Sequence, residues 1–281
     1  CCPLRLISAL PCCLDGSPDL DDSRSDPVID IKRLHLSFDG VNDVLSDIDF
    51  HLTSGEFVAI AGPSGCGKTT LLNLCAGLVE VPDGQHLAVA SKPPVLGGHD
   101  VAYMLARDSL FPWLSAIDNA AFGLKVRGTP EPEARTRAQT MLMRVGLAGY
   151  EDALPKALSH GMRQRVALAR TFAMPSPLLL MDEPFGALDA QTKLQLQDLL
   201  LQLCQESERS VLFVTHDLAE AVALADRVII MSSRPGRIIA DVPVPLPRPR
   251  SIRQLQTNDA FHQTYAAVWR HLEEGWTHHE G

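Results

Sequence analysis

Apolar and polar positions divide this chain into short stretches of two kinds. In some, apolar residues alternate with polar ones or form short continuous runs, which is typical of strands; in others they recur every three or four positions, as on one face of a helix. The pattern predicts strands over 28–31, 34–38, 44–52, 57–61, 87–90, 101–105, 177–181, 210–215 and 228–231. It predicts helices over 71–76, 134–145, 166–172, 192–204 and 218–225, and a last one around 261–272.

The order of these elements indicates the fold class. The later strands are apolar on nearly every residue and alternate with helices, which is typical of a parallel sheet covered on both faces. From 117 to about 157 the pattern is helical without strands. We therefore expect an α/β protein whose core has a mainly parallel sheet and carries a helical insert.

Composition narrows the class of protein further. The chain has 281 residues, of which 46% are apolar and 21% charged, and these are ordinary values for a soluble globular protein. No apolar run approaches the roughly 18 to 20 residues of a membrane span. The net charge of −9 argues against a nucleic-acid surface, because binding to a phosphate backbone requires a basic face. Seven cysteines, an odd number without zinc-ligand spacing, favour a reducing compartment over a disulfide framework.

A glycine-rich stretch lies between the expected strand 57–61 and the expected helix 71–76. It reads Gly62-Pro63-Ser64-Gly65-Cys66-Gly67-Lys68-Thr69-Thr70 and matches the phosphate-binding pattern G-x-x-x-x-G-K-[ST]. In such a loop the backbone N–H groups point at phosphate oxygens, and the helix N-terminus adds about half a positive charge. We expect Lys68 to reach the β- and γ-phosphates and the Thr69 hydroxyl to bind Mg²⁺. A reagent that alkylates Cys66 is expected to block ATP binding.

Two carboxylates follow the apolar strand 177–181. Asp182 would hold Mg²⁺ through water at the carboxyl edge of the sheet, and Glu183 would face the γ-phosphate and polarise the attacking water. The alternative is that the two residues cap the next helix. The phosphate-binding loop earlier in the chain favours the first interpretation. Further on, Asp217 and Glu220 have the spacing of a helix N-cap with a carboxylate at the third helical position.

The run from Leu158 to Arg170 resembles a known family. It begins Leu-Ser-His-Gly-Met-Arg-Gln-Arg before a helix and is similar to the signature sequence of ATP-binding cassette (ABC) ATPases, usually Leu-Ser-Gly-Gly-Gln. In that family the Ser and the Gly bind the γ-phosphate held by the opposite subunit, so the resemblance assigns this role to Ser159 and Gly161. An ordinary Ser-capped helix would explain five of the residues, but not the whole run.

Other elements of the family occur in order between Val28 and about Pro245. The resemblance implies that Asp189 belongs to the loop that crosses a dimer interface, and that His216 bonds the γ-phosphate. It also implies that Phe38 stacks on adenine; the alternative is a core phenylalanine. The implied catalytic residues are Glu183, His216 and Lys68, the implied metal ligands are Thr69 and Asp182, and the implied cofactors are ATP and Mg²⁺.

Two positions depart from the family pattern. Ala106 occupies the place of a glutamine that usually precedes Leu-Pro-Trp, and alanine cannot ligate Mg²⁺ or sense the γ-phosphate. Either Arg107 or Asp108 would take over part of that coupling, or Mg²⁺ would bind with an extra water. His160 replaces the first glycine of the signature and puts a side chain where the family has close backbone approach.

The resemblance also implies a domain organisation. The fold class is α/β, with a P-loop NTPase (RecA-like) core built on a mainly parallel sheet, an antiparallel β subdomain and an inserted helical subdomain. Residues 1–27 are expected to be a disordered leader, and 28–245 the ABC ATPase domain with its helical subdomain at about 106–164. Residues 246–281 are expected to form a short C-terminal helical tail.

Two stretches, Phe111-Pro112-Trp113-Leu114 and Pro247-Arg248-Pro249-Arg250, resemble the ATPases of nitrate, sulfonate and taurine importers. The resemblance implies a peripheral subunit on the cytoplasmic face of the cell membrane, which powers the uptake of a small solute. The implied partners are a second ATPase subunit in a homodimer, an integral membrane permease and, indirectly, a solute-binding protein, with no nucleic acid. The alternatives are a non-transport ABC ATPase and a weakly hydrolysing ABC subunit, the latter because of Ala106 and His160.

Overall fold

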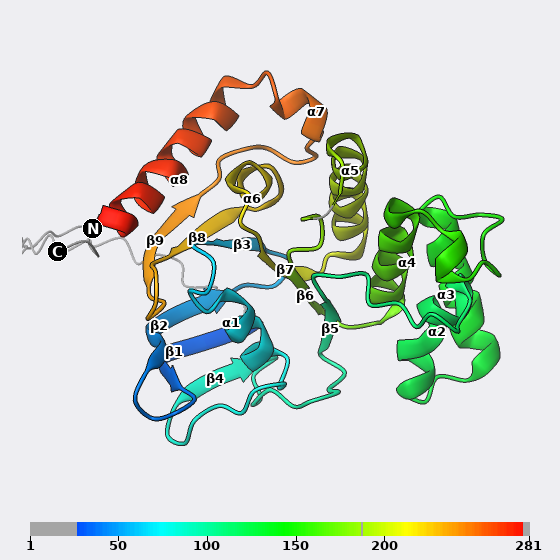
Figure 1. Ribbon diagram of the computed structural model, residues 1–281, viewed down its shortest axis with the longest axis horizontal. Coiled ribbons are helices and arrows are strands. Elements are labelled where there is room, and N and C mark those ends of the chain that lie inside the picture. The colour runs from blue at the N-terminus through cyan, green and yellow to red at the C-terminus, as the bar shows by residue number, and fades with distance from the viewer. Residues whose placement is uncertain (1–26, 187, 278–281) are drawn as a thin grey trace, which may run out of the picture.

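The computed structural model describes residues 27–186 and 188–277. Figure 1 shows two sheets, helices on both sides of the larger one, and a group of helices at one end. The expected leader lies outside the described residues apart from Pro27. Within the described ranges, no helix is both long enough and apolar enough to cross a bilayer.

The strands and helices agree with the hydrophobic pattern except at their ends. The pattern did not predict the strand Ile238–Pro243 or the short helix Ile252–Leu255. The strands are β1 (Ile29–Ser37), β2 (Asp43–Leu52), β3 (Phe57–Ala61), β4 (His86–Val89), β5 (Val101–Met104), β6 (Leu178–Asp182), β7 (Ser210–Val214), β8 (Arg227–Met231) and β9 (Ile238–Pro243). The helices are α1 (Lys68–Cys75), α2 (Ala116–Val126), α3 (Glu131–Arg144), α4 (His160–Ala173), α5 (Ala190–Ser207), α6 (Leu218–Leu224), α7 (Ile252–Leu255) and α8 (Asp259–Thr277), with a 3₁₀ turn η1 (Pro155–Ala157). The expected strands 28–31 and 34–38 form the single strand β1, whose pairing with β2 is interrupted by register shifts.

The larger sheet has the strand order β5-β6-β7-β3-β8-β9. β5, β6, β7, β3 and β8 pair in parallel, and β9 runs antiparallel to β8 at the edge. The sequence pattern missed β9 because its residues alternate between half-buried and exposed and none is fully buried. Its last residue is Pro243, and an edge strand tolerates proline because one side of its backbone needs no N–H donor.

Successive residues of the parallel strands point into two different cores. In β3, Phe57, Ala59 and Ala61 belong to a core shared with α4, α5, α6 and α8. Val58 and Ile60 belong to a second core shared with α1 and the smaller sheet. All five residues of the strand are buried. The strand is apolar throughout because both of its faces are covered.

The smaller sheet and the helical group lie at opposite ends of the larger sheet (Figure 1). The smaller sheet is antiparallel with the order β2-β1-β4. The helical group, α2 to α4, is inserted between β5 and β6, and α4 packs against both α2 and β5. The fold is therefore the α/β class that the sequence predicted, with a mainly parallel sheet, an antiparallel part and a helical insert.

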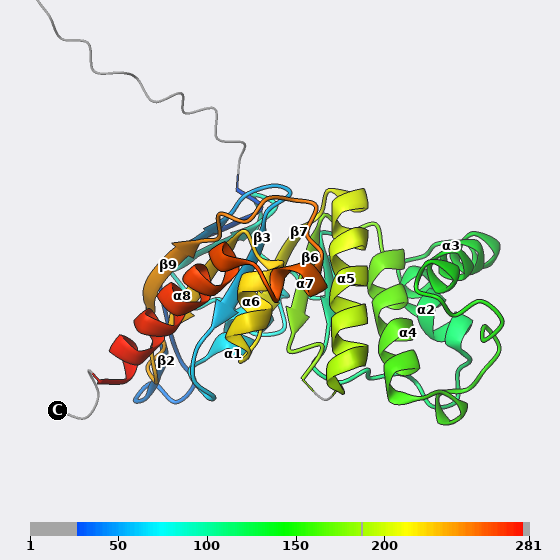
Figure 2. The same cartoon turned by 90° about the horizontal axis from the view of Figure 1, so that it is seen from above.

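The C-terminal helix α8 lies along the edge of the larger sheet. Phe261, Thr264, Val268 and Leu272 form its buried stripe, which packs on α6, β8 and β9. Figure 2 shows α8 beside α6, on the side of the sheet away from the helical group. The helix therefore covers one face of β8 and of the edge strand β9.

Candidate functional site

Three neighbouring strands of the larger sheet end at one edge. β6, β7 and β3 are adjacent, and the loop 62–67 follows β3 while Thr215, His216 and Asp217 follow β7. Asp182 is the last residue of β6. Because parallel strands share the edge at which they end, the fold gathers these segments from distant parts of the chain.

The loop 62–67 folds around the side chain of Lys68. The Nζ atom of Lys68 donates to the carbonyl oxygens of Gly62 and Pro63, at 2.8 Å each, and the residue is only 6% exposed. Gly67 has a φ of 101°, and a Cβ there would lie 2.7 Å from a methyl carbon of Leu45. Any other residue at this position would be strained and would clash. The loop therefore holds the amine of Lys68 at the start of α1.

A hydroxyl and a carboxylate meet beside this loop. The Oγ1 atom of Thr69 donates to Oδ1 of Asp182 over 3.1 Å. Burial raises the pKa of Asp182, and the nearby Glu183 raises it further, while the bond from Thr69 acts in the opposite direction. A carboxylate in this position gains stability from a cation.

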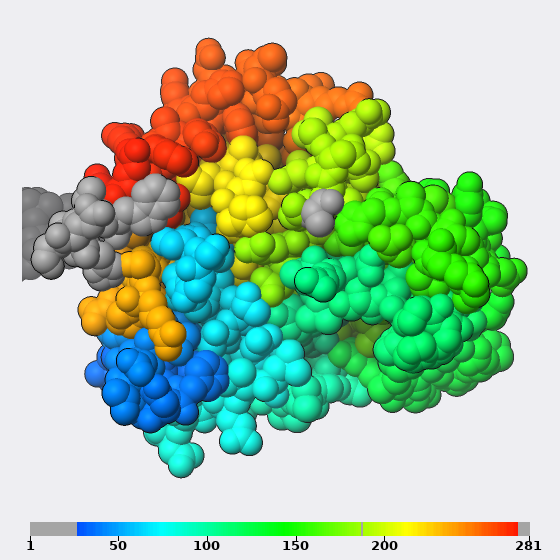
Figure 3. Space-filling view, in the orientation of Figure 1, coloured from blue at the N-terminus to red at the C-terminus, as the bar shows by residue number. Residues whose placement is uncertain are grey.

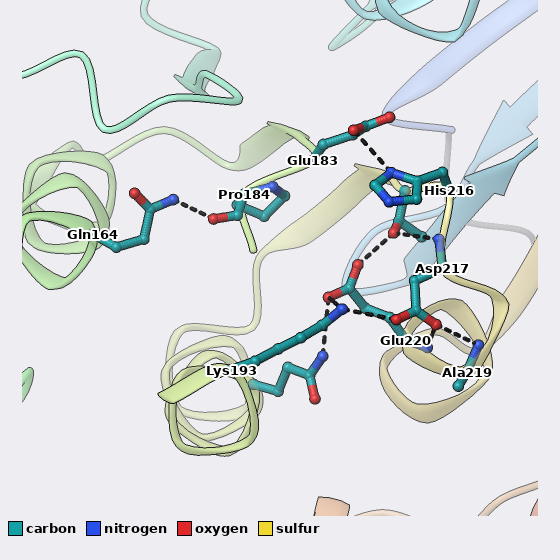
Figure 4. A network of polar contacts seen from close by, with 10 residues as sticks. Gln164, Glu183, Pro184, Lys193, His216, Asp217, Ala219 and Glu220 are labelled. Carbon is teal, nitrogen blue, oxygen red and sulfur yellow. Dashed lines mark hydrogen bonds and ion pairs between the residues drawn. The ribbon is translucent and has the colours of Figure 1, made fainter. Parts of the chain in front are cut away.

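Glu183 turns away from Asp182 and contacts His216. Its φ of 43° lies in the left-handed region, and its N–H donates to the carbonyl oxygen of Val214 over 2.9 Å. The turn directs the carboxylate toward the loop after β7, where Oε2 lies 2.9 Å from Nδ1 of His216 (Figure 4). Neither carboxylate caps the next helix, because Asp189 caps α5 through the N–H of Thr192.

Two further residues of the predicted site differ in exposure. Phe38 follows β1 and is 66% exposed, so it is not the core phenylalanine that the alternative required. Cys66 is buried within the loop, and burial raises the pKa of its thiol. We therefore expect its alkylation to be slow.

The signature-like residues lie apart from the loop of their own chain. Ser159 caps α4 by accepting from the N–H of Met162 over 3.3 Å, and His160 is exposed on the first turn with Nδ1 3.1 Å from a guanidinium nitrogen of Arg163. Gly161 approaches α5, where a Cβ would lie 2.7 Å from Thr192. In Figures 1 and 2, α4 and α1 are separated by the strands of the larger sheet. One chain therefore does not bring Ser159 and Gly161 to its own phosphate loop.

The segment 106–109, which lacks the expected glutamine, is hydrogen-bonded to α4. Ala106 is exposed, and Arg163 donates through Nε to Oδ2 of Asp108 over 2.8 Å. Arg170 donates to the backbone oxygens of Asp108 and Ser109 at 2.8 Å each. The carboxylate of Asp108 is thus bound to the signature helix, and of the two expected substitutes only Arg107 has an exposed side chain.

The sequence did not single out three polar residues near this site. Gln164 is 2% exposed and donates through Nε2 to the carbonyl oxygen of Pro184, while its Oε1 has no partner among the described residues. Lys193 extends from α5 to the carboxylate of Glu220 (Figure 4). Gln197 of the same helix donates to that carboxylate through Nε2. The sequence signal for Lys193 and Gln197 was that two polar residues stand four positions apart on the buried side of an amphipathic helix.

A phosphate-binding loop between a buried strand and a helix, with a carboxylate that ends another parallel strand of the same sheet, defines a P-loop nucleoside triphosphatase. The ABC transporter family model matches residues 45–186. A putative ATP-binding protein of Brucella abortus is 47% identical over 243 residues, which cover 86% of this chain and 92% of that protein. The taurine import ATP-binding protein TauB of Escherichia coli is 43% identical over 217 residues, which cover 77% of this chain and 84% of TauB.

The chain therefore belongs to the ABC transporter family, as an ATP-binding ATPase subunit of a transporter. The solved structure of CbiO1 from Clostridium perfringens, part of the ABC transporter complex CbiONQ, superposes with a TM-score of 0.70. It covers 89% of this chain and all of CbiO1 at 24% identity. This likeness supports the fold.

Proposed function

We propose that this ATPase powers an importer from the cytoplasmic face of the membrane, and that hydrolysis takes place at the carboxyl edge of β3, β6 and β7. The observation that carries the proposal is the contact of Glu183 with His216 beside the pair formed by Thr69 and Asp182. A base, a hydrogen-bonding imidazole, a hydroxyl and a buried carboxylate surround one phosphate-binding loop. These are the groups that phosphoryl transfer to water requires.

The phosphates of ATP bind to the loop from Gly62 to Thr70. Its N–H groups and the N-terminus of α1 face the phosphate oxygens, and Lys68 exchanges its two carbonyl contacts for the β- and γ-phosphates. Phe38 stacks on the adenine, for which its exposed ring is available.

The oxygen atoms of Thr69 and Asp182 fit Mg²⁺. They are hard ligands that lie 3.1 Å apart, and a cation would offset the cost of burying the carboxylate. Thr69 would bind the ion directly and Asp182 through water. When bound, Mg²⁺ neutralises charge on the β- and γ-phosphate oxygens.

Glu183 orients the attacking water and accepts its proton, and His216 holds the γ-phosphate. The two side chains already lie within hydrogen-bonding distance, so a γ-phosphate beside His216 would place its phosphorus close to the carboxylate. The left-handed backbone at Glu183 directs this side chain away from the Mg²⁺ ligand Asp182. The two adjacent carboxylates thereby take different roles.

The site is completed by a second copy of the chain. Ser159 and Gly161 begin a helix whose N-terminus favours an anion, and they lie apart from their own loop. Two copies arranged head-to-tail would place each α4 N-terminus over the partner's γ-phosphate, with Asp189 at the interface. We propose this homodimer as the active form.

A groove on the helical side of the molecule fits a helix of the membrane permease. It has a volume of about 420 Å³, and Figure 3 shows the hollow between the cyan segment before β5 and the green helices. The lining is apolar and includes Val95, Leu96, Leu105, Phe111, Phe122 and Val126. Most of these side chains are exposed, which is typical of a surface that binds another protein. An amphipathic helix placed in such a groove is a common recognition mode.

The solute is proposed to be a small one that is nitrate-, sulfonate- or taurine-like. The relative TauB is a taurine import ATP-binding protein, and the similarity extends over most of both chains. A solute-binding protein would deliver the solute to the permease. Cells whose only copy carries Lys68→Ala should then lose uptake of labelled taurine or nitrate; unchanged uptake of both would contradict this solute class.

Complementation between inactive variants tests the composite site. Lys68→Ala disables the phosphate-loop half, and Ser159→Arg disables the signature half. Each variant alone should be inactive, but in a mixed dimer one of the two sites has both halves intact, so the mixture should hydrolyse ATP. A mixture of Lys68→Ala and Glu183→Gln is the matched control, because both changes affect the same half and no intact site forms. Equal inactivity of the two mixtures would contradict the head-to-tail dimer.

A further inference from the structure

We propose that Lys193 is a positioning residue that couples the interface loop before α5 to His216. The inference rests on the proposed roles of His216 and Glu183. Lys193 contacts neither of these side chains. It acts through the buried carboxylate of Glu220 and through Asp217, the residue that follows His216.

Glu220 is the centre of the network (Figure 4). It is 4% exposed, and its two oxygens accept from two elements. Oε2 accepts from the hydroxyl of Thr215, and Oε1 accepts from Nε2 of Gln197 at 2.9 Å and lies 3.3 Å from Nζ of Lys193. A buried carboxylate needs such partners, because an unpaired charge in the interior is costly.

The network fixes both chain neighbours of His216. The Thr215 hydroxyl donates to Glu220 and accepts from the N–H of Asp217 at 3.0 Å. Asp217 caps α6 with Oδ1, and its Oδ2 accepts from Nζ of Lys193 at 2.8 Å. The imidazole of His216 is itself exposed and contacts Glu183. Its position is therefore set by the backbone on either side, which Lys193 and Glu220 hold.

The same lysine lies in the first turn of α5. Its N–H donates to the carbonyl oxygen of Asp189 at 2.9 Å, and the carboxylate of Asp189 caps the helix. The start of α5 follows the loop that the proposed dimer places at its interface. A shift of this turn when the partner subunit arrives moves Nζ of Lys193, and with it Asp217 and the backbone of His216.

The experiment separates this coupling from simple structural support. Lys193→Met keeps the length of the side chain and removes the charge. We expect kcat for ATP hydrolysis to fall about tenfold to a hundredfold with KM for ATP within about twofold, because a displacement of about 1 Å has effects of that size. Lys193→Arg, whose guanidinium reaches both carboxylates, should restore most of the rate.

The double variant Lys193→Met, Glu220→Gln removes the uncompensated buried charge as well. We expect it to recover thermal stability while kcat stays low. Recovery of kcat together with stability would overturn the inference, because the lysine would then only support the fold. Lys125→Met is the matched control, since Lys125 also bridges two carboxylates, those of Asp118 and Glu131, but lies on α2. It should keep the wild-type kcat; a loss equal to that of Lys193→Met would also overturn the inference.

His216→Ala separates a failure of the proposed function from a failure of the coupling role of Lys193. If His216→Ala loses activity and Lys193→Met does not, the proposed function stands and the coupling role of Lys193 is wrong. If His216→Ala hydrolyses ATP at the wild-type rate, the proposed role of His216 is wrong and the inference fails with it.

Discussion

The Nδ1 atom of His216 lies 2.9 Å from Oε2 of Glu183, although the two residues follow different strands. An ionised carboxylate only accepts hydrogen bonds, so this contact places a proton on Nδ1 and leaves Nε2 directed elsewhere. A ring that is protonated at both nitrogens would donate through Nδ1 to the carboxylate and through Nε2 to a phosphate oxygen. In the proposed mechanism the two residues act as one unit.

The first prediction concerns His216. His216→Ala should lower kcat for ATP hydrolysis by about a hundredfold or more, because the variant loses a polar contact that strengthens as negative charge develops on the γ-phosphate. ATP affinity should change little, since most of the binding contacts lie in the loop from Gly62 to Thr70. Phosphate release at saturating ATP and binding of a fluorescent ATP analogue measure the two quantities. A loss of affinity that fully accounts for the loss of rate would contradict the assigned role.

Lys68 should control the stabilisation of the protein by ATP. At a ligand concentration of about 100 times Kd, binding adds about 2.7 kcal/mol to the free energy of unfolding, or roughly 5 °C or more to Tm for a chain of this size. Lys68→Ala should show almost none of this shift. The exposed Lys92 supplies the control Lys92→Ala, which should shift as the wild type does. Differential scanning fluorimetry measures the shift in Tm. A full shift in Lys68→Ala would show that Lys68 does not contribute to ATP binding.

The ring of Phe38 should contribute to nucleotide affinity but little to stability. Stacking of a base on an aromatic side chain contributes about 1 to 3 kcal/mol, so Phe38→Ala should weaken ATP binding roughly fivefold to a hundredfold. Because the side chain is largely exposed, the unfolding midpoint should stay close to that of the wild type. Val41→Ala, at an exposed neighbour in the same turn, should leave both unchanged. Equal affinities of the two variants would show that the ring does not stack.

The buried thiols should react slowly and with a strong dependence on pH. Burial raises the pKa of Cys66, and it raises the pKa values of Cys75 and Cys204 to about 12. Below a raised pKa the thiolate fraction grows about tenfold per pH unit, so alkylation should keep accelerating beyond about pH 9, where a free thiol levels off. Peptide mass spectrometry of native protein treated with iodoacetamide at several pH values measures the rate of alkylation at each cysteine. Rapid modification of Cys66 near neutral pH without denaturant would contradict its burial.

Much of the fold could be predicted because the sequence pattern reports burial. The strands of the parallel sheet are apolar on both faces, so they stand out, and the loop from Gly62 to Thr70 identifies its own strand and helix. β9 could not be found in this way, since it is half-exposed at an edge next to prolines. The pattern also divided β1 at Arg33, whose φ of 46° marks an irregularity within a continuous strand.

The site was predictable as a set of residues but not as an arrangement. The spacing of Asp182 and Glu183 indicates two carboxylates after a strand, but not that a left-handed φ turns the second toward His216. The network of Lys193 and Glu220 joins helices α5 and α6, and contacts between elements far apart in the chain leave little trace in local periodicity. Gln164 was missed for the same reason, since its partner is a backbone oxygen.

The most direct test of the account is the rate of ATP hydrolysis by Glu183→Gln. Glutamine keeps the size of the side chain but cannot accept the proton of the attacking water, so hydrolysis at saturating ATP should fall about a hundredfold to ten-thousandfold. ATP binding should persist, and light scattering should detect an ATP-dependent dimer that the wild type forms only transiently. Glu80→Gln, an exposed site away from the loop, should hydrolyse ATP at the wild-type rate. Hydrolysis by Glu183→Gln within about threefold of the wild type would show that Glu183 is not the base and would contradict the central claim.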